Sequence, residues 1–231
     1  MKSAQDILRE VREIFATKWQ RRVGRKVPEA EDVKLGNDAV ELNGTVLYAD
    51  MADSTGLVNR YKDWFAAKAY KSYLMSACHI IRDNSGVITA FDGDRVMAVF
   101  LGKTKNSSAA KAALQINYIV RQINSVLKKA YPNTAYRLRQ AIGIDTSDLF
   151  VARTGIRDSN DLVWVGRSAN YAAKLCGLAD TTYSIFITKP VFDVLTDGSK
   201  YGGRPRKCMW GKVIWQEMGV AVYRSSWWWE F

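Results

Sequence analysis

The sequence contains one histidine, His79, which lies in the run "SYLMSACHIIRDN". Apolar residues recur in this run at helical spacing, so we expect His79 at a packed helix position. A Ser-His-Asp hydrolase needs a histidine beside its nucleophile, and the GxSxG motif of many such enzymes is also missing. The sequence therefore argues against a hydrolase of that kind.

Cysteine is scarce, and long apolar runs are missing. Cys78, Cys176 and Cys208 lie far apart and form no CxxC pair, so they predict neither a zinc site nor a disulfide framework. No apolar run approaches the roughly 20 residues of a membrane span. The charged start "MKSAQDILRE" does not resemble a secretory signal. These features together predict a protein of the reducing cytoplasm, without a membrane partner.

Positive charge is abundant. The chain of 231 residues carries a formal net charge of +11, with 48% hydrophobic and 25% charged residues. This composition is typical of a folded protein, and the charge indicates a polyanionic partner such as nucleic acid, acidic lipid or a nucleoside triphosphate. A nucleic-acid-binding protein with a ferredoxin-like sheet is one alternative. Its aromatic RNP pattern is not found in the predicted strands.

The hydrophobic pattern predicts an α+β fold. We expect an N-terminal amphipathic helix and connector over residues 1–43 and a catalytic domain over residues 44–231. The βαββαβ-like order predicts a ferredoxin-like core, with a mixed, mostly antiparallel sheet and helices packed on it. The terminal "SSWWWEF" predicts a packing or dimer edge. The expected elements, in chain order, are a helix over 3–20, a polar connector over 21–44, a strand over 45–50, a helical region over 55–83, a hairpin in "GVITAFDGDRVMAVFLG", a helix over 106–130, two strands around Asp145–Asp148, a strand in "DLVWVG", a helix in "RSANYAAKLCGLA" and strands near 184–188, 212–216 and 220–224.

Carboxylates stand at two predicted strand ends. The stretch "TVLYADMADSTGL" ends a strand at Asp50, and "FDGDRV" places Asp94 at a hairpin tip. In the expected topology these positions are neighbours, where two carboxylates repel unless a cation lies between them. Mg²⁺ or Mn²⁺ suits such a site, and the backbone carbonyl of Met51 could add a ligand. A triphosphate could bind the amides at the following helix start, which belong to Asp53, Ser54, Thr55 and Gly56.

Three motifs in this order resemble those of class III nucleotidyl cyclases. They are "YADMADST", "GDRVMAVF" and "VWVGRSANYAAK", and the resemblance covers roughly residues 44–224. It implies that Asp50 and Asp94 hold two divalent metal ions, Mn²⁺ or Mg²⁺, and that Asn170 orients the ribose. Lys174 stands where the family usually has a phosphate-binding arginine, so it keeps the charge but loses the bidentate fork. The resemblance also implies a head-to-tail homodimer whose active sites are shared between two chains.

Departures from the family pattern concern the base. Two positions that read a purine are apolar here, Ala90 and Val163, whereas Tyr48 and Arg95 are larger or more polar than usual. Polar purine edges would be left unpaired beside the apolar residues. The pattern resembles the pyrimidine cyclases of bacterial antiphage (Pycsar) systems, and Arg95 suits the two carbonyl acceptors of uracil. Arg95 could instead be a surface arginine, and Tyr48 a core aromatic.

The resemblance implies conversion of UTP to 3′,5′-cyclic UMP and pyrophosphate, by attack of the ribose 3′-oxygen on the α-phosphorus. The product would be a second messenger that activates a separate effector protein in antiviral defence. Two alternatives remain open: a cytidylate cyclase that makes cyclic CMP, and a degenerate cyclase-like module that binds nucleotide without turnover. Metal-dependent turnover distinguishes the last from the other two.

Overall fold

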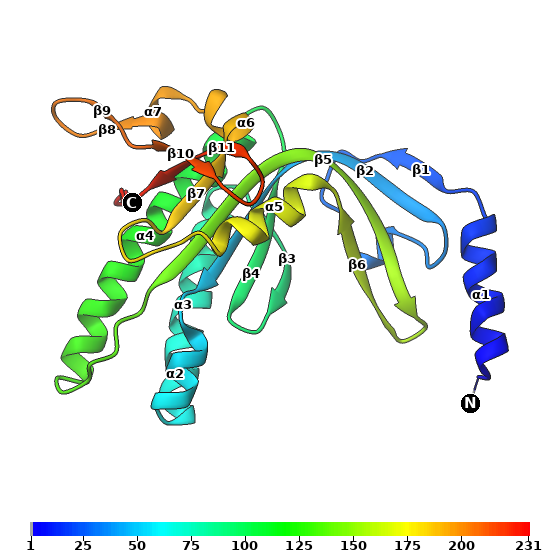
Figure 1. Cartoon of the computed structure of the whole chain (residues 1–231), viewed down its shortest axis with the longest axis horizontal. Helices are drawn as coiled ribbons and strands as arrows, with labels where there is room; N and C mark the ends of the chain where they lie inside the picture. Colours follow the sequence, from blue (N-terminus) through cyan, green and yellow to red (C-terminus); the bar gives the residue numbers. More distant parts are fainter. Residues whose placement is uncertain (1) are drawn as a thin grey trace. The chain divides into compact units, whose positions relative to one another are not determined.

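The helices and strands follow the predicted α+β order. The computed structural model describes residues 2–231 (Figure 1). Its helices, including the short 3-10 helix η1, are α1 (Ala4–Ala16), η1 (Ala30–Asp32), α2 (Ser54–Arg60), α3 (Asp63–Asp83), α4 (Lys105–Ala130), α5 (Arg167–Cys176), α6 (Lys189–Asp193) and α7 (Asp197–Lys200). Its strands are β1 (Gln20–Val23), β2 (Asp38–Met51), β3 (Val87–Asp92), β4 (Arg95–Phe100), β5 (Gln140–Ile156), β6 (Ser159–Val165), β7 (Ile185–Thr188), β8 (Tyr201–Gly202), β9 (Lys207–Cys208), β10 (Gly211–Trp215) and β11 (Val220–Ser225).

The chain divides into two compact units. The larger unit consists of Gly44–Ser147 and Arg167–Phe231. The smaller unit consists of the N-terminal part of the chain through Asn43, together with Asp148–Gly166. Two long strands, β2 and β5, each begin in one unit and end in the other.

The sheet of the larger unit has the order β10-β11-β7-β5-β2-β4-β3. Neighbouring strands pair antiparallel in β2–β4, β3–β4, β7–β11 and β10–β11, whereas β5 and β7 run parallel. The sequence β2, α2 and α3, β3, β4, α4, β5 confirms the ferredoxin-like arrangement, with a mostly antiparallel sheet.

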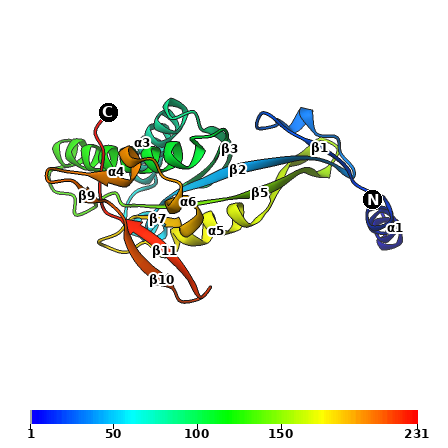
Figure 2. The ribbon, with the colours of Figure 1, turned by 90° about the horizontal axis from the view of Figure 1, so that it is seen from above.

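Helices cover both faces of this sheet (Figure 2). Alternate strand residues such as Leu47 and Ile187 form one buried cluster with residues of α3 and α4. Phe186, which points the opposite way from Ile187, forms a second cluster with Leu175 of α5 and Trp215 of β10. Because side chains of a strand alternate between its faces, α3 and α4 cover one face and α5 the other.

The smaller unit is built around the outer parts of the two long strands. β1 pairs in parallel with the start of β2, and β6 forms an antiparallel hairpin with the end of β5. The ring of Trp19 packs edge-to-face on Phe150, with 4.9 Å between the ring centroids. Helix α1 begins with a capping box formed by Ser3 and Asp6, and none of its residues is buried.

Several local predictions differ from the structure. Residues 21–44 are more than a connector, because they contain β1 and the first part of β2. The helical region over 55–83 is two helices that break at Tyr61–Lys62. The predicted pair of strands around Asp145–Asp148 is one continuous strand, β5. His79 lies on α3 as expected, but on its exposed side rather than at a packed position.

The tryptophans near the C-terminus serve packing. Trp227 and Trp229 pack against the main core, and the Trp229 backbone amide donates a 3.0 Å hydrogen bond to the Leu114 carbonyl oxygen. Trp228 is more exposed and lies beside Tyr118, with 5.7 Å between the ring centroids. Within residues 2–231, no helix has both the length and the apolar character that crossing a membrane requires.

Candidate metal and nucleotide site

The site is built where two central strands meet. β2 and β4 are antiparallel neighbours with Ala49 opposite Val96, so Asp50 at the end of β2 lies beside the start of β4. The turn before β4 has Gly93 in the left-handed region, at φ 60°, and is followed by Asp94. Since this tight turn ends beside Asp50, the register of the sheet brings the two predicted carboxylates to the same place.

Asp50 is held by the residue that follows Asp94. Arg95 Nη2 donates a 3.0 Å hydrogen bond to Asp50 Oδ2, and the Asp50 side chain is only 17% exposed. Burial raises the pKa of Asp50 above its usual value, and the nearby Asp94 charge adds to the rise. Arg95 lowers the pKa of Asp50, but by less than burial and the Asp94 charge together raise it. The positive charge of Arg95 therefore only partly compensates for the desolvation of the ionised Asp50 carboxylate.

Two polar atoms beside Asp50 are buried without a partner. Neither Asp94 Oδ2 nor Arg95 Nε makes a hydrogen bond to any described residue. A buried carboxylate oxygen without a donor is costly in a folded protein, and a bound cation would satisfy it. The residues present therefore fit a divalent metal ion of the Mg²⁺ or Mn²⁺ type.

The protein supplies few ligands for such an ion. Among residues 2–231, no group of three or more His, Cys, Asp or Glu side chains is arranged to hold a metal. The two carboxylates, with the backbone carbonyl predicted from Met51, fall short of an octahedral shell. This is the pattern for Mg²⁺, which keeps waters and takes its remaining ligands from substrate phosphates.

Tyr48 stands on the same face of β2 as Asp50, two residues earlier. The Arg95 guanidinium lies over the Tyr48 ring, 5.8 Å from its centroid. Burial raises the pKa of the half-buried Tyr48. Tyr73 of α3, fully buried, donates a 3.2 Å hydrogen bond to the Asp50 carbonyl oxygen and fixes the strand end. Tyr48, Asp50 and Arg95 thus form one cluster.

The two apolar positions that were predicted to face the base lie on different strands. Ala90 is on β3, opposite Met97 of β4, and is partly buried. Val163 is on β6 of the smaller unit, opposite Ala152, and is 38% exposed.

The predicted phosphate-binding turn has an acidic side chain over it. Asp53 occupies the N-cap position of α2 in the left-handed region, at φ 61°, and its side chain makes no capping hydrogen bond. Its carboxylate covers Gly56, where an added Cβ would lie 2.4 Å from Asp53 Oδ1.

A cavity of about 220 Å³ opens beside this turn, and it contains basic residues that sequence analysis missed. Arg60, Arg137 and Arg139 line it together with Asp53 and Gly56. The sequence did contain a signal for Arg137 and Arg139, which alternate in "YRLRQ". Residues two apart project to the same side of an extended segment, so the pattern predicts two arginines on one side of the chain.

Helix α5 carries the third motif. Asn170 and Lys174 are four residues apart, so they share a helix face, and both are exposed. Lys174 Nζ donates to Glu217 Oε1 at 2.6 Å.

The start of α5 is fastened to β5. Arg167 forms an ion pair with the fully buried Asp145, with 2.9 Å between Nε and Oδ2. Gly143 of β5 faces the helix so closely that an added Cβ would lie 2.0 Å from the Ala172 carbonyl oxygen. Only glycine permits this approach, so β5 sets the position of α5.

Comparison with known proteins identifies relatives over nearly the whole chain. No protein-family model matches the sequence. A uridylate cyclase of Burkholderia cepacia is 47% identical over 231 residues, which cover 99% of both chains. A uridylate cyclase of Xanthomonas perforans is 46% identical over 220 residues, which cover 94% of both. In fold, the chain is similar to the solved structure of the adenylyl cyclase CyaB from P. aeruginosa, with a TM-score of 0.68 at 18% identity, over 81% of this chain and 95% of that one.

Proposed function

The chain belongs to the uridylate cyclase family, and we propose that it converts UTP to 3′,5′-cyclic UMP and pyrophosphate. The observation that carries this proposal is the cluster of Asp50, Asp94 and Arg95 at the meeting of β2 and β4. One cluster holds both the carboxylates that a metal needs and the cation that a pyrimidine base can use.

Asp50 and Asp94 are the proposed metal ligands, joined by the Met51 carbonyl. Two divalent ions, Mn²⁺ or Mg²⁺, would supply positive charge that lowers the pKa of the ribose 3′-hydroxyl and neutralises the departing pyrophosphate. The unpartnered Asp94 Oδ2 supports this assignment. No side chain is needed as a general base, and none of the three motifs contains a histidine.

Arg95 and Tyr48 are the proposed base-reading residues. The Arg95 guanidinium lies over the Tyr48 ring. Its Nε makes no hydrogen bond to any described residue, so it is available as a donor. A guanidinium is a donor only, so it matches the carbonyl acceptors of uracil better than the exocyclic amine of cytosine. Apolar Ala90 and Val163 offer no partner to the polar edge of a purine, which disfavours ATP and GTP.

The triphosphate is proposed to bind at the start of α2. The amides of Asp53, Ser54, Thr55 and Gly56 are its candidates there, and the Asp53 carboxylate would have to move aside. Arg60, Arg137 and Arg139 in the adjoining cavity supply the charge that attracts phosphates and that outweighs Asp53.

Asn170 and Lys174 complete the site from a second chain. In a head-to-tail homodimer each active site would take Asp50 and Asp94 from one protomer and Asn170 and Lys174 from its partner. Asn170 then orients the ribose, and Lys174 contacts a phosphate. The 3′-oxygen attacks the α-phosphorus, its proton passes to solvent, and pyrophosphate leaves.

The biological setting is part of the same proposal. Cyclic UMP would act as a second messenger on a separate effector in antiphage defence, in the cytoplasm. Cys78, Cys176 and Cys208 are unpaired thiols, which suits a reducing compartment.

A product assay tests the proposal. The purified protein is incubated with each of the four ribonucleoside triphosphates and Mn²⁺, and the products are separated by chromatography. We expect cyclic UMP from the wild type and none from Asp50→Ala. Cyclic CMP as the main product would make the protein a cytidylate cyclase. Binding of UTP without any product would favour the degenerate module.

A further inference from the structure

Lysine at position 174 raises a problem of orientation. An arginine binds phosphate through a rigid planar fork, whereas a lysine ammonium is a point charge on four flexible methylenes. Lys174 is on the exposed face of α5, with its side chain 51% exposed, so solvent leaves it many conformations. Something outside α5 must restrict them if the ammonium is to meet a phosphate reliably.

Glu217 is placed to do so. It lies in the turn between β10 and β11, and its Oε1 is 2.6 Å from Lys174 Nζ. The turn itself is well defined, because the backbone amides of Met218 and Gly219 both donate to the Trp215 carbonyl oxygen, at 3.2 and 2.9 Å. Gly219 completes it in the left-handed region, at φ 63°.

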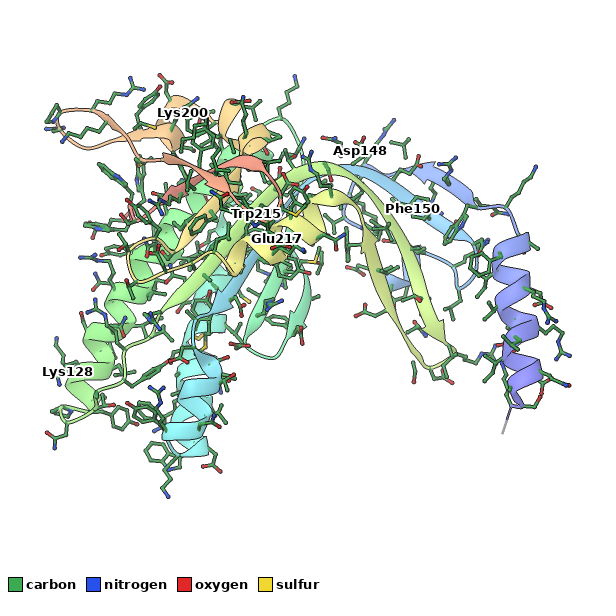
Figure 3. All side chains as sticks on the ribbon, in the orientation of Figure 1. Lys128, Asp148, Phe150, Lys200, Trp215 and Glu217 are labelled. Atoms are coloured by element: carbon green, nitrogen blue, oxygen red, sulfur yellow. The ribbon has the colours of Figure 1, made fainter. Side chains whose placement is uncertain are left out.

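The same turn is fixed to α5 at a second point. Trp215 is 2% exposed and packs edge-to-face on Tyr171, with 5.3 Å between the ring centroids. Tyr171 and Lys174 are three residues apart, so they are neighbours on the surface of α5. Figure 3 shows Trp215 and Glu217 beside this helix. The contact between buried Trp215 and Tyr171 thus fixes the turn from which Glu217, itself 61% exposed, reaches Lys174.

We propose that Glu217 is a positioning residue that orients the Lys174 ammonium toward a substrate phosphate. The inference rests on the proposed function, in which Lys174 contacts that phosphate. An ammonium has three donors, so one can remain on Glu217 while two are offered to phosphate oxygens. The Glu217 carboxylate thus restricts the conformations of the lysine side chain, a restriction that an arginine would not need because its guanidinium is rigid and planar.

The proposal predicts that kcat depends on Glu217 when residue 174 is lysine, and not when it is arginine. Four proteins are compared: wild type, Glu217→Gln, Lys174→Arg and the double variant. With Lys174 present, we expect Glu217→Gln to lower kcat about 3- to 10-fold with less than about a twofold change in KM. In the Lys174→Arg background, the same change should alter kcat less than about twofold. With Lys174 present, Glu217→Asp should retain more of the activity than Glu217→Gln does.

A matched ion pair provides the control. Lys189 and Asp193 form an exposed pair within α6, so Asp193→Asn removes a comparable contact that lies outside all three motifs. It should leave kcat unchanged. The Tm of every variant is measured as well, because a loss of kcat that only follows a loss of stability would be accompanied by a lower Tm.

The outcomes separate the two proposals. Equal losses of kcat from Glu217→Gln in the lysine and arginine backgrounds, or no loss in either, would overturn the positioning role. If the wild type forms no cyclic nucleotide, the proposed function fails. Calorimetric binding of UTP then compares the same four proteins, and the positioning role requires weaker binding from Glu217→Gln in the lysine background alone.

Discussion

At the scale of single residues, the buried Asp50 carboxylate lowers the stability of the folded protein. Burial raises the pKa of this carboxylate although Arg95 donates to it. At neutral pH the carboxylate is ionised in both the folded and the unfolded chain, so the folded state bears the desolvation penalty. As the pH falls through the raised pKa, the folded protein takes up a proton before the unfolded chain does, and the penalty disappears.

Asp50→Asn should therefore stabilise the protein while it abolishes turnover. We expect the Tm to rise by a few degrees at neutral pH, and the gain to shrink as the pH falls through the raised pKa of Asp50, where the wild-type carboxylate takes up a proton. Differential scanning fluorimetry across this pH range measures it. Exposed Asp193→Asn should show no such trend. A lower Tm for Asp50→Asn at neutral pH would mean that the Arg95 pair outweighs desolvation.

At the scale of elements, the contact between β5 and α5 places the third motif. Gly143 allows the Ala172 carbonyl oxygen to approach the strand, and the buried Asp145 holds Arg167 and accepts a hydrogen bond from Thr188. Asn170 and Lys174 therefore owe their position to a glycine and an aspartate that do not take part in the proposed chemistry.

Gly143→Ala should displace α5. The added methyl group would meet a backbone oxygen, which cannot move as a flexible side chain can, so we expect a loss of about 1–3 kcal/mol in the free energy of unfolding. kcat should fall at temperatures where the variant is still folded. Denaturant titration and the product assay measure the two effects. Gly198→Ala is the control, because nothing lies within 4 Å of its added Cβ, and an unchanged kcat in Gly143→Ala would contradict the role of this contact.

The same strand explains where sequence analysis failed. "DTSD" at 145–148 has the composition of a turn, which is why two strands were predicted where β5 is continuous. The polar run can stay in the strand because Asp145 finds partners on Arg167 and Thr188, and that is tertiary information. β1 was missed for another reason: all four of its residues are exposed, so it has no apolar alternation.

The meeting of Asp50 and Asp94 was easier to predict than the strand ends, while their role in metal binding stays a prediction. Asp50, Asp94 and Arg95 belong to local motifs, and the βαββαβ order alone predicted that the two carboxylates meet. Glu217 and Arg139 belong to no recognised motif, and they reach the third motif and the α2 turn only through folding.

At the scale of the whole molecule, the proposed sharing of active sites between two chains predicts complementation. Asp50→Ala and Asn170→Ala are each expected to be inactive, but a mixed dimer has one site with both residues intact. After subunit exchange of equal amounts we expect about a quarter of wild-type activity, since about half of the dimers are mixed and each has one working site of two. The product assay measures it.

The control mixes two variants from the same half of the site. Asp50→Ala with Asp94→Ala leaves every site without one of its proposed metal ligands, so activity should stay absent. Recovery there, or none in the first mixture under conditions that exchange subunits, would contradict sites shared between chains.

The two long strands that run through both compact units also constrain how the gene can change. A single-residue insertion in β2 would turn every later side chain of the strand to the opposite face, so Asp50 would exchange places with its neighbours. The same holds for β5 and the glycine on which α5 rests. Length variation among descendants of this chain should therefore collect between β1 and β2 and at the β5–β6 turn, and avoid Asp38–Met51 and Gln140–Ile156.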